Sequence, residues 1–195
     1  MLSASEMQTL RTKLEEYEGN IPHMYLDAKG LVTVGIGYLL ANAVEAQKLP
    51  FVNNTTGKAA TAAEIKTDYD NVKKQSKGFL AGFYKKFTKL KLTPNEIDLL
   101  TNKTINQFYG ELKTVYPDYD SYPGEVKLAL FDMIYNLGMS GLSNNWPNFN
   151  KYIKAKDWKN AAAESKRKPP VSPDRNKYVK DLLEQAAKLT TPPKP

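Results

Sequence analysis

Two carboxylates and one hydroxyl lie close together near the start of the chain, within residues 18–40. Glu18, Asp27 and Thr33 are spaced by nine and six residues, with glycines between and after them. Hydrolysis of a glycosidic bond needs one carboxylic acid to protonate the leaving oxygen, and a second group to activate water or attack the sugar. These three side chains are therefore candidates for a glycosidase site. Taken alone, such carboxylates are also common as capping and turn residues.

The local pattern indicates how these side chains are positioned. Residues 4–17 predict a helix, because a capping box is followed by apolar residues at three- and four-residue steps, and Glu18 falls at the helix end. The negative end of the helix dipole and partial burial favour the protonated form that a general acid needs. A β-hairpin follows, with Asp27 solvated just before its turn and Thr33 just after it. In a tight hairpin these two side chains can hold one water molecule.

The rest of the chain is predicted to be mainly helical. Two more capping boxes start helices near residues 61 and 93, and the apolar segment 125–137 predicts a central buried helix. Residues 41–60 are polar and predict mostly loop, with room for one short helix. Three closing helices are expected over residues 147–156, 158–166 and 173–189.

These elements predict an α+β fold that is mainly α. We expect a single catalytic domain over residues 1–190, followed by a tail at 191–195. Within it, a hairpin lobe would cover about residues 18–60, and a helical lobe about residues 1–17 and 61–190.

The amino-acid composition excludes or disfavours several classes of catalytic and metal site. The chain contains no cysteine and a single histidine, His23, which we interpret as a surface residue. Disulfides and thiolate metal sites are excluded, and a histidine-based triad or metal centre is disfavoured. We therefore expect no metal and no cofactor. No apolar run is long enough to cross a bilayer, and the first twenty residues do not resemble a secretory signal.

The net charge of +7 favours polyanionic partners, although dispersed lysines that solubilise the surface explain it equally well. Nearly all basic residues are lysine, which disfavours a sequence-specific nucleic-acid reader. Residues 78–92 are basic and aromatic, and predict a short helix with a connector. This segment is either a core-packing helix, which we favour, or a membrane-active amphipathic one.

Three segments, in order along the chain, resemble phage-type lysozymes, the T-even phage lysozyme-like muramidases of glycoside hydrolase family 24. The first segment contains Glu18-Gly19, Tyr25-Leu26-Asp27, Gly30, Thr33-Val34-Gly35-Ile36-Gly37 and Leu39. The second is residues 130–138, and the third comprises residues 158–163 and 172–176. Tyr38 departs from the family, since many members carry histidine there.

The resemblance implies a lysozyme-like fold with a cleft between a hairpin lobe and a helical lobe. It implies that Glu18 is the general acid and that Asp27 and Thr33 hold the nucleophilic water in an inverting hydrolysis. The expected target is the β-1,4 bond between N-acetylmuramic acid and N-acetylglucosamine in peptidoglycan.

The resemblance also implies residues around this centre. Leu39 and Tyr135 would line the sugar cleft from opposite lobes. Asn136 would either contact an acetamido sugar or cap the end of its helix. Arg175 is expected to support the general acid by pairing with it, the alternative being a solvent-exposed position at a helix start. Tyr25 belongs to the first segment and takes a supporting role.

The expected partner is peptidoglycan, bound by a monomer without nucleic acid and without stable membrane insertion. Synthesised without a signal peptide, the protein would act in the periplasm or cell wall, as a phage-type endolysin, a secreted antibacterial effector or part of a larger polypeptide. A toxin would also have an immunity protein as partner. The alternative from another class is a catalytically inactive wall-binding or regulatory protein on the same scaffold.

Overall fold

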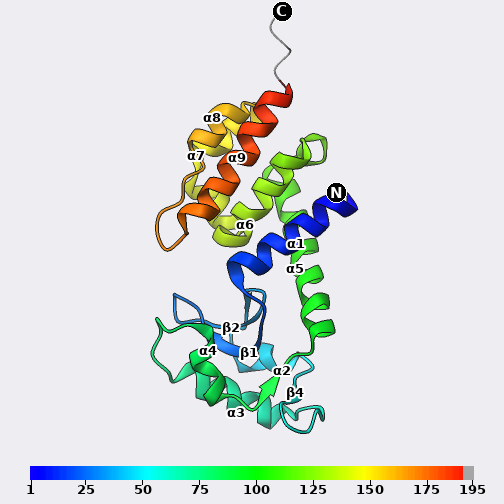
Figure 1. Cartoon of the computed structure of the whole chain (residues 1–195), viewed down its shortest axis with the longest axis vertical. Coiled ribbons are helices and arrows are strands. Elements are labelled where there is room, and N and C mark those ends of the chain that lie inside the picture. The colour runs from blue at the N-terminus through cyan, green and yellow to red at the C-terminus, as the bar shows by residue number, and fades with distance from the viewer. Residues whose placement is uncertain (191–195) are drawn as a thin grey trace, which may run out of the picture. The chain divides into compact units, whose positions relative to one another are not determined.

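The computed structural model describes residues 1–190, so the predicted tail at 191–195 lies outside the described residues. Helices dominate and the strands form only small antiparallel sheets, which confirms the predicted α+β class with mainly α content (Figure 1). The helices are α1 (Ala4–Glu18), α2 (Ala43–Gln47), α3 (Ala62–Lys73), α4 (Ala81–Tyr84), α5 (Pro94–Val115), α6 (Gly124–Asn145), α7 (Pro147–Lys154), α8 (Trp158–Ala163) and α9 (Pro173–Thr190), with short 3-10 helices η1 (Lys85–Phe87) and η2 (Tyr119–Ser121). The strands are β1 (Ile21–Leu26), β2 (Val32–Gly35), β3 (Tyr38–Leu39), β4 (Val52–Asn53) and β5 (Leu90–Lys91).

The chain forms two compact units. The hairpin unit is Glu18–Thr104, and the helical unit combines Met1–Tyr17 with the chain from Ile105 onward. Helices α3 and α4 pack against β1, which is why the hairpin unit continues past residue 60.

The hairpin unit is built on the antiparallel sheet β1-β2-β3. Tyr25 pairs with Thr33 across β1 and β2, and Thr33 pairs in turn with Leu39 on β3. Because successive side chains of a strand point to opposite faces, Val32 and Val34 lie on the other face of β2, where both are fully buried. The sheet therefore has one core face and one face that carries Tyr25, Thr33 and Leu39.

A second, two-stranded sheet joins β4 to β5, where the sequence predicts mostly loop. Val52 pairs with Lys91, so the strand forms only when two distant segments meet. The amide of Leu92 then donates to the carbonyl of Pro22 over 2.8 Å, which ties this sheet edge to β1.

In the helical unit, α9 packs against α6 and α8, and α7 packs against α8 (Figure 1). The predicted central helix is α6, and its apolar residues Leu130, Phe131 and Ile134 are fully buried. The helix is interrupted at Gly138 (φ 70°, ψ 166°), so its first segment ends where the sequence predicts.

Two of the predicted capping boxes form both of their hydrogen bonds. Glu6 accepts from the Ser3 amide over 2.6 Å and donates its own amide to the Ser3 hydroxyl. Thr61 and Glu64 make the same reciprocal pair at the start of α3. Each box satisfies backbone donors that have no partner inside the helix, and so sets where the helix begins.

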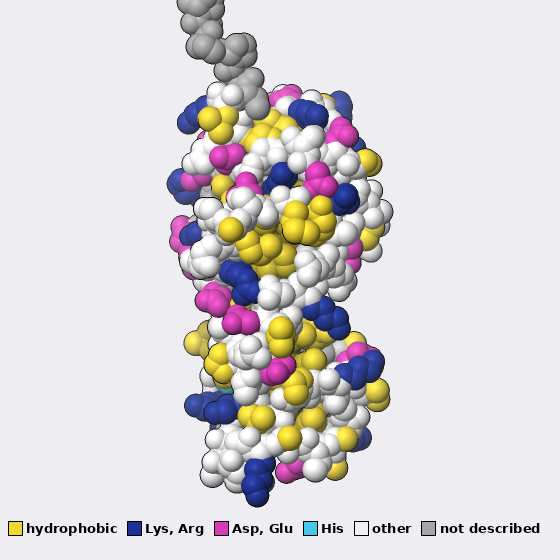
Figure 2. Space-filling model, turned by 90° about the vertical axis from the view of Figure 1, so that its right-hand side faces the viewer, with side chains coloured by type: hydrophobic (Ala, Val, Ile, Leu, Met, Phe, Trp, Pro, Cys, Tyr) yellow, Lys and Arg dark blue, Asp and Glu magenta, His cyan; other side chains and the backbone are white. Residues whose placement is uncertain are grey.

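Among the described residues, no helix is both long and apolar enough to cross a bilayer. On the face of the molecule drawn in Figure 2, Lys and Arg side chains are interspersed with Asp and Glu side chains.

Candidate functional site

Glu18 is the last residue of α1 and is half-buried. The helix ends there because Gly19 takes a left-handed conformation (φ 76°), which is common directly after a helix C-terminus. The carboxylate therefore lies at the negative end of the α1 dipole, as the sequence predicts.

Asp27 organises the turn between β1 and β2. Its Oδ1 accepts hydrogen bonds from the amides of Lys29 over 2.9 Å and of Leu31 over 2.8 Å. Its carbonyl accepts from the amide of Gly30, which has a positive φ of 82°, as this three-residue loop requires. The turn thus holds one carboxylate oxygen, and Oδ2 accepts no hydrogen bond from the residues that the structure describes.

The side chains of Thr33 and Asp27 both form a hydrogen bond with the backbone of Leu31. The Thr33 hydroxyl donates to the Leu31 carbonyl over 3.2 Å, and the Leu31 amide donates to Asp27. Thr33 is buried, with 4% of its surface exposed. Its hydroxyl oxygen keeps lone pairs that can accept a hydrogen bond from water.

The strand register places the predicted site residues of this unit on one face of the sheet. Tyr25 and Thr33 are cross-strand partners, and Asp27 lies two residues after Tyr25, so their side chains share a face. Leu39 pairs with Thr33 and is 48% exposed on the same face. The exposed Leu39 beside the buried Thr33 gives this face an apolar margin.

Tyr25 lies within electrostatic reach of both carboxylates. Burial is the main cause that raises the pKa of the Tyr25 phenol, and the negative charges of Glu18 and Asp27 raise it further. The phenol therefore stays protonated at neutral pH and can donate a hydrogen bond.

Tyr135 and Asn136 lie in α6, in the helical unit. Tyr135 is half-buried, and its ring packs edge-on against Phe108 with 5.4 Å between centroids. Asn136 is half-buried in the last turn before Gly138. Both residues thus lie near the end of the first segment of α6.

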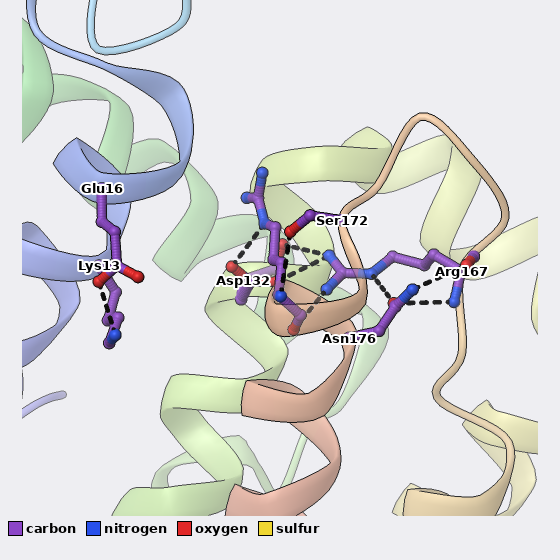
Figure 3. Close-up of polar contacts among 7 residues, drawn as sticks. Lys13, Glu16, Asp132, Arg167, Ser172 and Asn176 are labelled. Carbon is purple, nitrogen blue, oxygen red and sulfur yellow. Dashed lines mark hydrogen bonds and ion pairs between the residues drawn. The ribbon is translucent and has the colours of Figure 1, made fainter.

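Arg175 is buried, which overturns the alternative of a solvent-exposed position at the start of α9. Its Nε donates to Oδ2 of Asp132 over 2.9 Å, and its guanidinium lies 5.2 Å from the Tyr17 ring centroid. Arg167 Nη1 lies 2.7 Å from Oδ1 of the same aspartate, close enough for an ion pair but without hydrogen-bond geometry (Figure 3). One carboxylate thus meets two buried arginines.

No local sequence pattern predicts that Arg167 and Asp132 form a pair. Arg167 also donates to the carbonyl of Asp132 and to the side chain of Asn176 (Figure 3). The network joins α6, α9 and the connection between α8 and α9. In the sequence, this buried network is indicated only by the use of arginine at these positions, in a chain whose other basic residues are nearly all lysine.

The interpretation of His23 as a surface residue was wrong. His23 is buried in β1, and its Nε2 lies 3.0 Å from the carbonyl of Ala81 in α4. A carbonyl only accepts, so Nε2 carries the hydrogen in this contact. Burial is the main cause that lowers the pKa of this imidazole, and the charge of Lys85 lowers it further.

A hollow of about 590 Å³ lies elsewhere in the hairpin unit, between α3 and the segment that leads into β5. Its walls include Asp68, Lys74, Lys86, Phe87 and Lys89, and none of the predicted site residues. Among the described residues, no three His, Asp or Glu side chains cluster as metal ligands.

No protein-family model matches this chain, and no curated protein sequence matches it significantly. The family resemblance therefore depends on the residues and spacings described above.

Proposed function

We propose that the chain is a muramidase, which hydrolyses the β-1,4 bond between N-acetylmuramic acid and N-acetylglucosamine in peptidoglycan. The proposal includes the finer fold assignment, a lysozyme-like hairpin lobe and helical lobe with the substrate cleft between them. The observation that carries it is the strand register, which pairs Thr33 with Tyr25 and with Leu39 on one face of the sheet, beside the Asp27 turn and shortly after Glu18 ends helix α1.

In the proposed reaction, Glu18 gives its proton to the leaving glycosidic oxygen. Oδ2 of Asp27 and the Thr33 hydroxyl hold a water, which attacks the anomeric carbon from the opposite face of the sugar. The water adds its hydroxyl to that carbon, and its proton passes to Asp27. One water is consumed, and the anomeric configuration inverts.

The turn supports this assignment of roles. Two amides fix Oδ1 of Asp27, so the carboxylate has a defined orientation before any substrate arrives. Preorganisation of this kind lowers the cost of positioning the water. We also propose that Leu39 lines the sugar site beside Thr33, and that Tyr135, Asn136 and Arg175 keep the roles that the resemblance implies.

A second candidate function is wall binding without turnover. The observation that favours it is that Asp27 and Thr33 already have structural partners in the hairpin, since both bond to Leu31. A hairpin that only supports a binding surface would need the same bonds.

Release of reducing ends from purified peptidoglycan separates the two functions. We expect Glu18→Gln and Asp27→Asn to lose at least about a hundredfold in rate, the lower range for removal of a general acid or base. The matched control is Glu16→Gln, because Glu16 lies on the same helix, pairs with Lys13 and is exposed. The control should retain wild-type activity.

Wild-type activity in Glu18→Gln would exclude the proposed mechanism. If the wild type releases no ends but sediments with peptidoglycan, the binding function holds instead. Measuring the anomer of the first product by NMR tests inversion.

A further inference from the structure

The net positive charge of this protein comes from one segment. Residues 71–95 contain seven of the 28 basic residues and no acidic residue. The other 21 basic residues equal the 21 acidic residues of the chain in number. Outside this segment the formal charges therefore cancel, and the net charge of +7 belongs to about an eighth of the sequence.

The structure leaves all seven lysines of this segment exposed, namely Lys73, Lys74, Lys77, Lys85, Lys86, Lys89 and Lys91. Clustered like charges repel one another and are more favourable when an anionic partner covers them.

Apolar side chains are exposed among these lysines. Leu80, at the start of α4, is 89% exposed, and the neighbouring Phe79 is 51% exposed. Phe79 stacks on Phe83 with ring centroids 4.1 Å apart, and Phe83 lies 5.5 Å from Phe87. The result is a row of aromatic rings with an exposed leucine at one end.

Buried contacts fix this segment in the fold, so its exposed side chains belong to an ordered surface. Tyr84 is fully buried, and its hydroxyl donates to the Ser76 carbonyl over 2.9 Å. The Nε2 of His23 donates a hydrogen bond to the Ala81 carbonyl. One lysine of the segment also contacts the rings, since the Lys86 ammonium lies 4.3 Å from the Phe83 ring centroid.

We propose that this basic-aromatic surface (the seven lysines with Phe79, Leu80, Phe83 and Phe87) docks on an anionic lipid bilayer. Lysines attract anionic headgroups, and aromatic and leucine side chains enter the boundary between headgroups and acyl chains. A soluble polyanion would use the lysines and the ring faces but would gain nothing from an exposed leucine. The combination therefore favours a lipid surface over nucleic acid or an acidic polymer.

The hollow beside this surface is consistent with lipid headgroups. Lys74, Lys86 and Lys89 line it together with Phe87. The two acidic groups in its wall already accept hydrogen bonds within the fold, Asp68 from the amides of Lys89 and Leu90 and Glu64 from the amide and hydroxyl of Thr61. The lysines there remain available to phosphate groups.

Docking would also place the candidate site next to the bilayer. The Lys73 ammonium donates to the Gly30 carbonyl over 3.1 Å, in the turn that Asp27 organises. The stem of Lys77 also lies against Gly30. The surface and the site hairpin are thus neighbouring parts of one unit.

A fluorescent probe tests insertion directly, because the chain contains no cysteine and a single one can be labelled. Leu80→Cys and Leu99→Cys, each carrying an environment-sensitive dye, are mixed with vesicles of phosphatidylcholine and phosphatidylglycerol in equal parts. Leu99 is the matched control, since it is 56% exposed on α5 of the same unit. We expect a blue shift at position 80 and none at position 99.

Vesicle sedimentation of the full chain measures the affinity. Leu80→Ser should weaken partition by about tenfold, and Lys77→Gln and Lys85→Gln by about fivefold each. Leu99→Ser and Lys103→Gln, exposed changes on α5, should leave partition unchanged. Activity on soluble peptidoglycan should be the same in Leu80→Ser as in the wild type, so this test fails or succeeds independently of the proposed muramidase function.

The proposal is overturned if phosphatidylglycerol vesicles bind no better than phosphatidylcholine vesicles, or if both labelled positions shift equally. It is also overturned if the lysine variants lose binding to a soluble polyanion such as heparin while Leu80→Ser changes nothing with vesicles. That outcome would assign the surface to an acidic polymer.

Discussion

Nε of Arg175 donates to Oδ2 of Asp132 over 2.9 Å, and both side chains are buried. The contact joins the first turn of α9 to the middle of α6. Arg167 pairs with the same carboxylate, so two buried arginines share one buried aspartate in the interior of the helical unit. Loss of Asp132 would break both of these ion pairs and leave each arginine buried without that partner.

Replacement of Asp132 should therefore be strongly destabilising. We expect Asp132→Asn to lower the free energy of unfolding by about 3–5 kcal/mol, the cost of breaking a buried ion pair. Urea denaturation followed by circular dichroism measures this change. The control is Asp181→Asn, which breaks an exposed pair with Lys177 on α9 and should cost at most about 0.5 kcal/mol. Equal effects of the two changes would show that the network contributes little.

The turn role and the chemical role of Asp27 can be separated. Asp27→Asn retains a side-chain oxygen that can accept from Lys29 and Leu31, so its free energy of unfolding should stay within about 0.5 kcal/mol of the wild type. Asp27→Ala loses both bonds and should cost about 1–2 kcal/mol. Thermal unfolding of the two variants, beside the activity assay above, gives the comparison. A catalytic Asp27 requires that the stable Asn variant be inactive.

His23 should make the stability depend on pH. Its pKa in the folded protein is lowered, mainly by burial, so the unfolded chain binds the proton more readily. The free energy of unfolding is therefore not reduced by His23 at pH values above the imidazole pKa of the unfolded chain, about 6.5. It decreases as the pH falls from there toward the lowered pKa of the folded protein. Denaturation at about pH 7.5 and about pH 5.5 should show a larger loss in the wild type than in His23→Gln.

His23→Gln is the suitable comparison because its amide nitrogen can still donate to Ala81 but does not titrate. Carboxylates that titrate in the same range affect both proteins equally. The same pH dependence in both would show that His23 is not the group responsible.

Replacing Gly138 and replacing Gly110 by alanine should change the free energy of unfolding in opposite directions. Gly138 has φ 70° and ψ 166°, a region that almost only glycine adopts, so Gly138→Ala should cost about 1–3 kcal/mol. Gly110 lies inside α5, and a Cβ there meets nothing within 4 Å. Gly110→Ala should therefore stabilise by about 0.5–1 kcal/mol. The unfolding midpoints of the two variants should lie on opposite sides of the wild type, and a stabilising Gly138→Ala would contradict the backbone argument.

Much of the local structure follows from short-range patterns. The starts of α1 and α3 were predictable because Ser3–Glu6 and Thr61–Glu64 form reciprocal bonds across three residues. The turn at Asp27 was predictable for the same reason, since its bonds reach only to Leu31. The candidate cluster of Glu18, Asp27 and Thr33 lies in one such segment, so its members could be named from their spacing.

Other features depend on residues that are distant in the sequence. Val52 finds its strand partner at Lys91, so residues 41–60 carry no local signal for β4. Residues 78–92 are neither simply a core helix nor a free amphipathic one, since Tyr84 is buried while Leu80 is exposed.

The sequence by itself determined where most of the helices begin, where the first hairpin turns and which carboxylates accompany it, because these depend on contacts within a few residues. Only the tertiary structure decided that His23 is buried, that Arg175 pairs with Asp132 and that the lysines of residues 71–95 are exposed together with Leu80. Burial and ion pairing depend on which segments pack together. His23 and Ala81 are 58 residues apart, and no local pattern encodes such a contact.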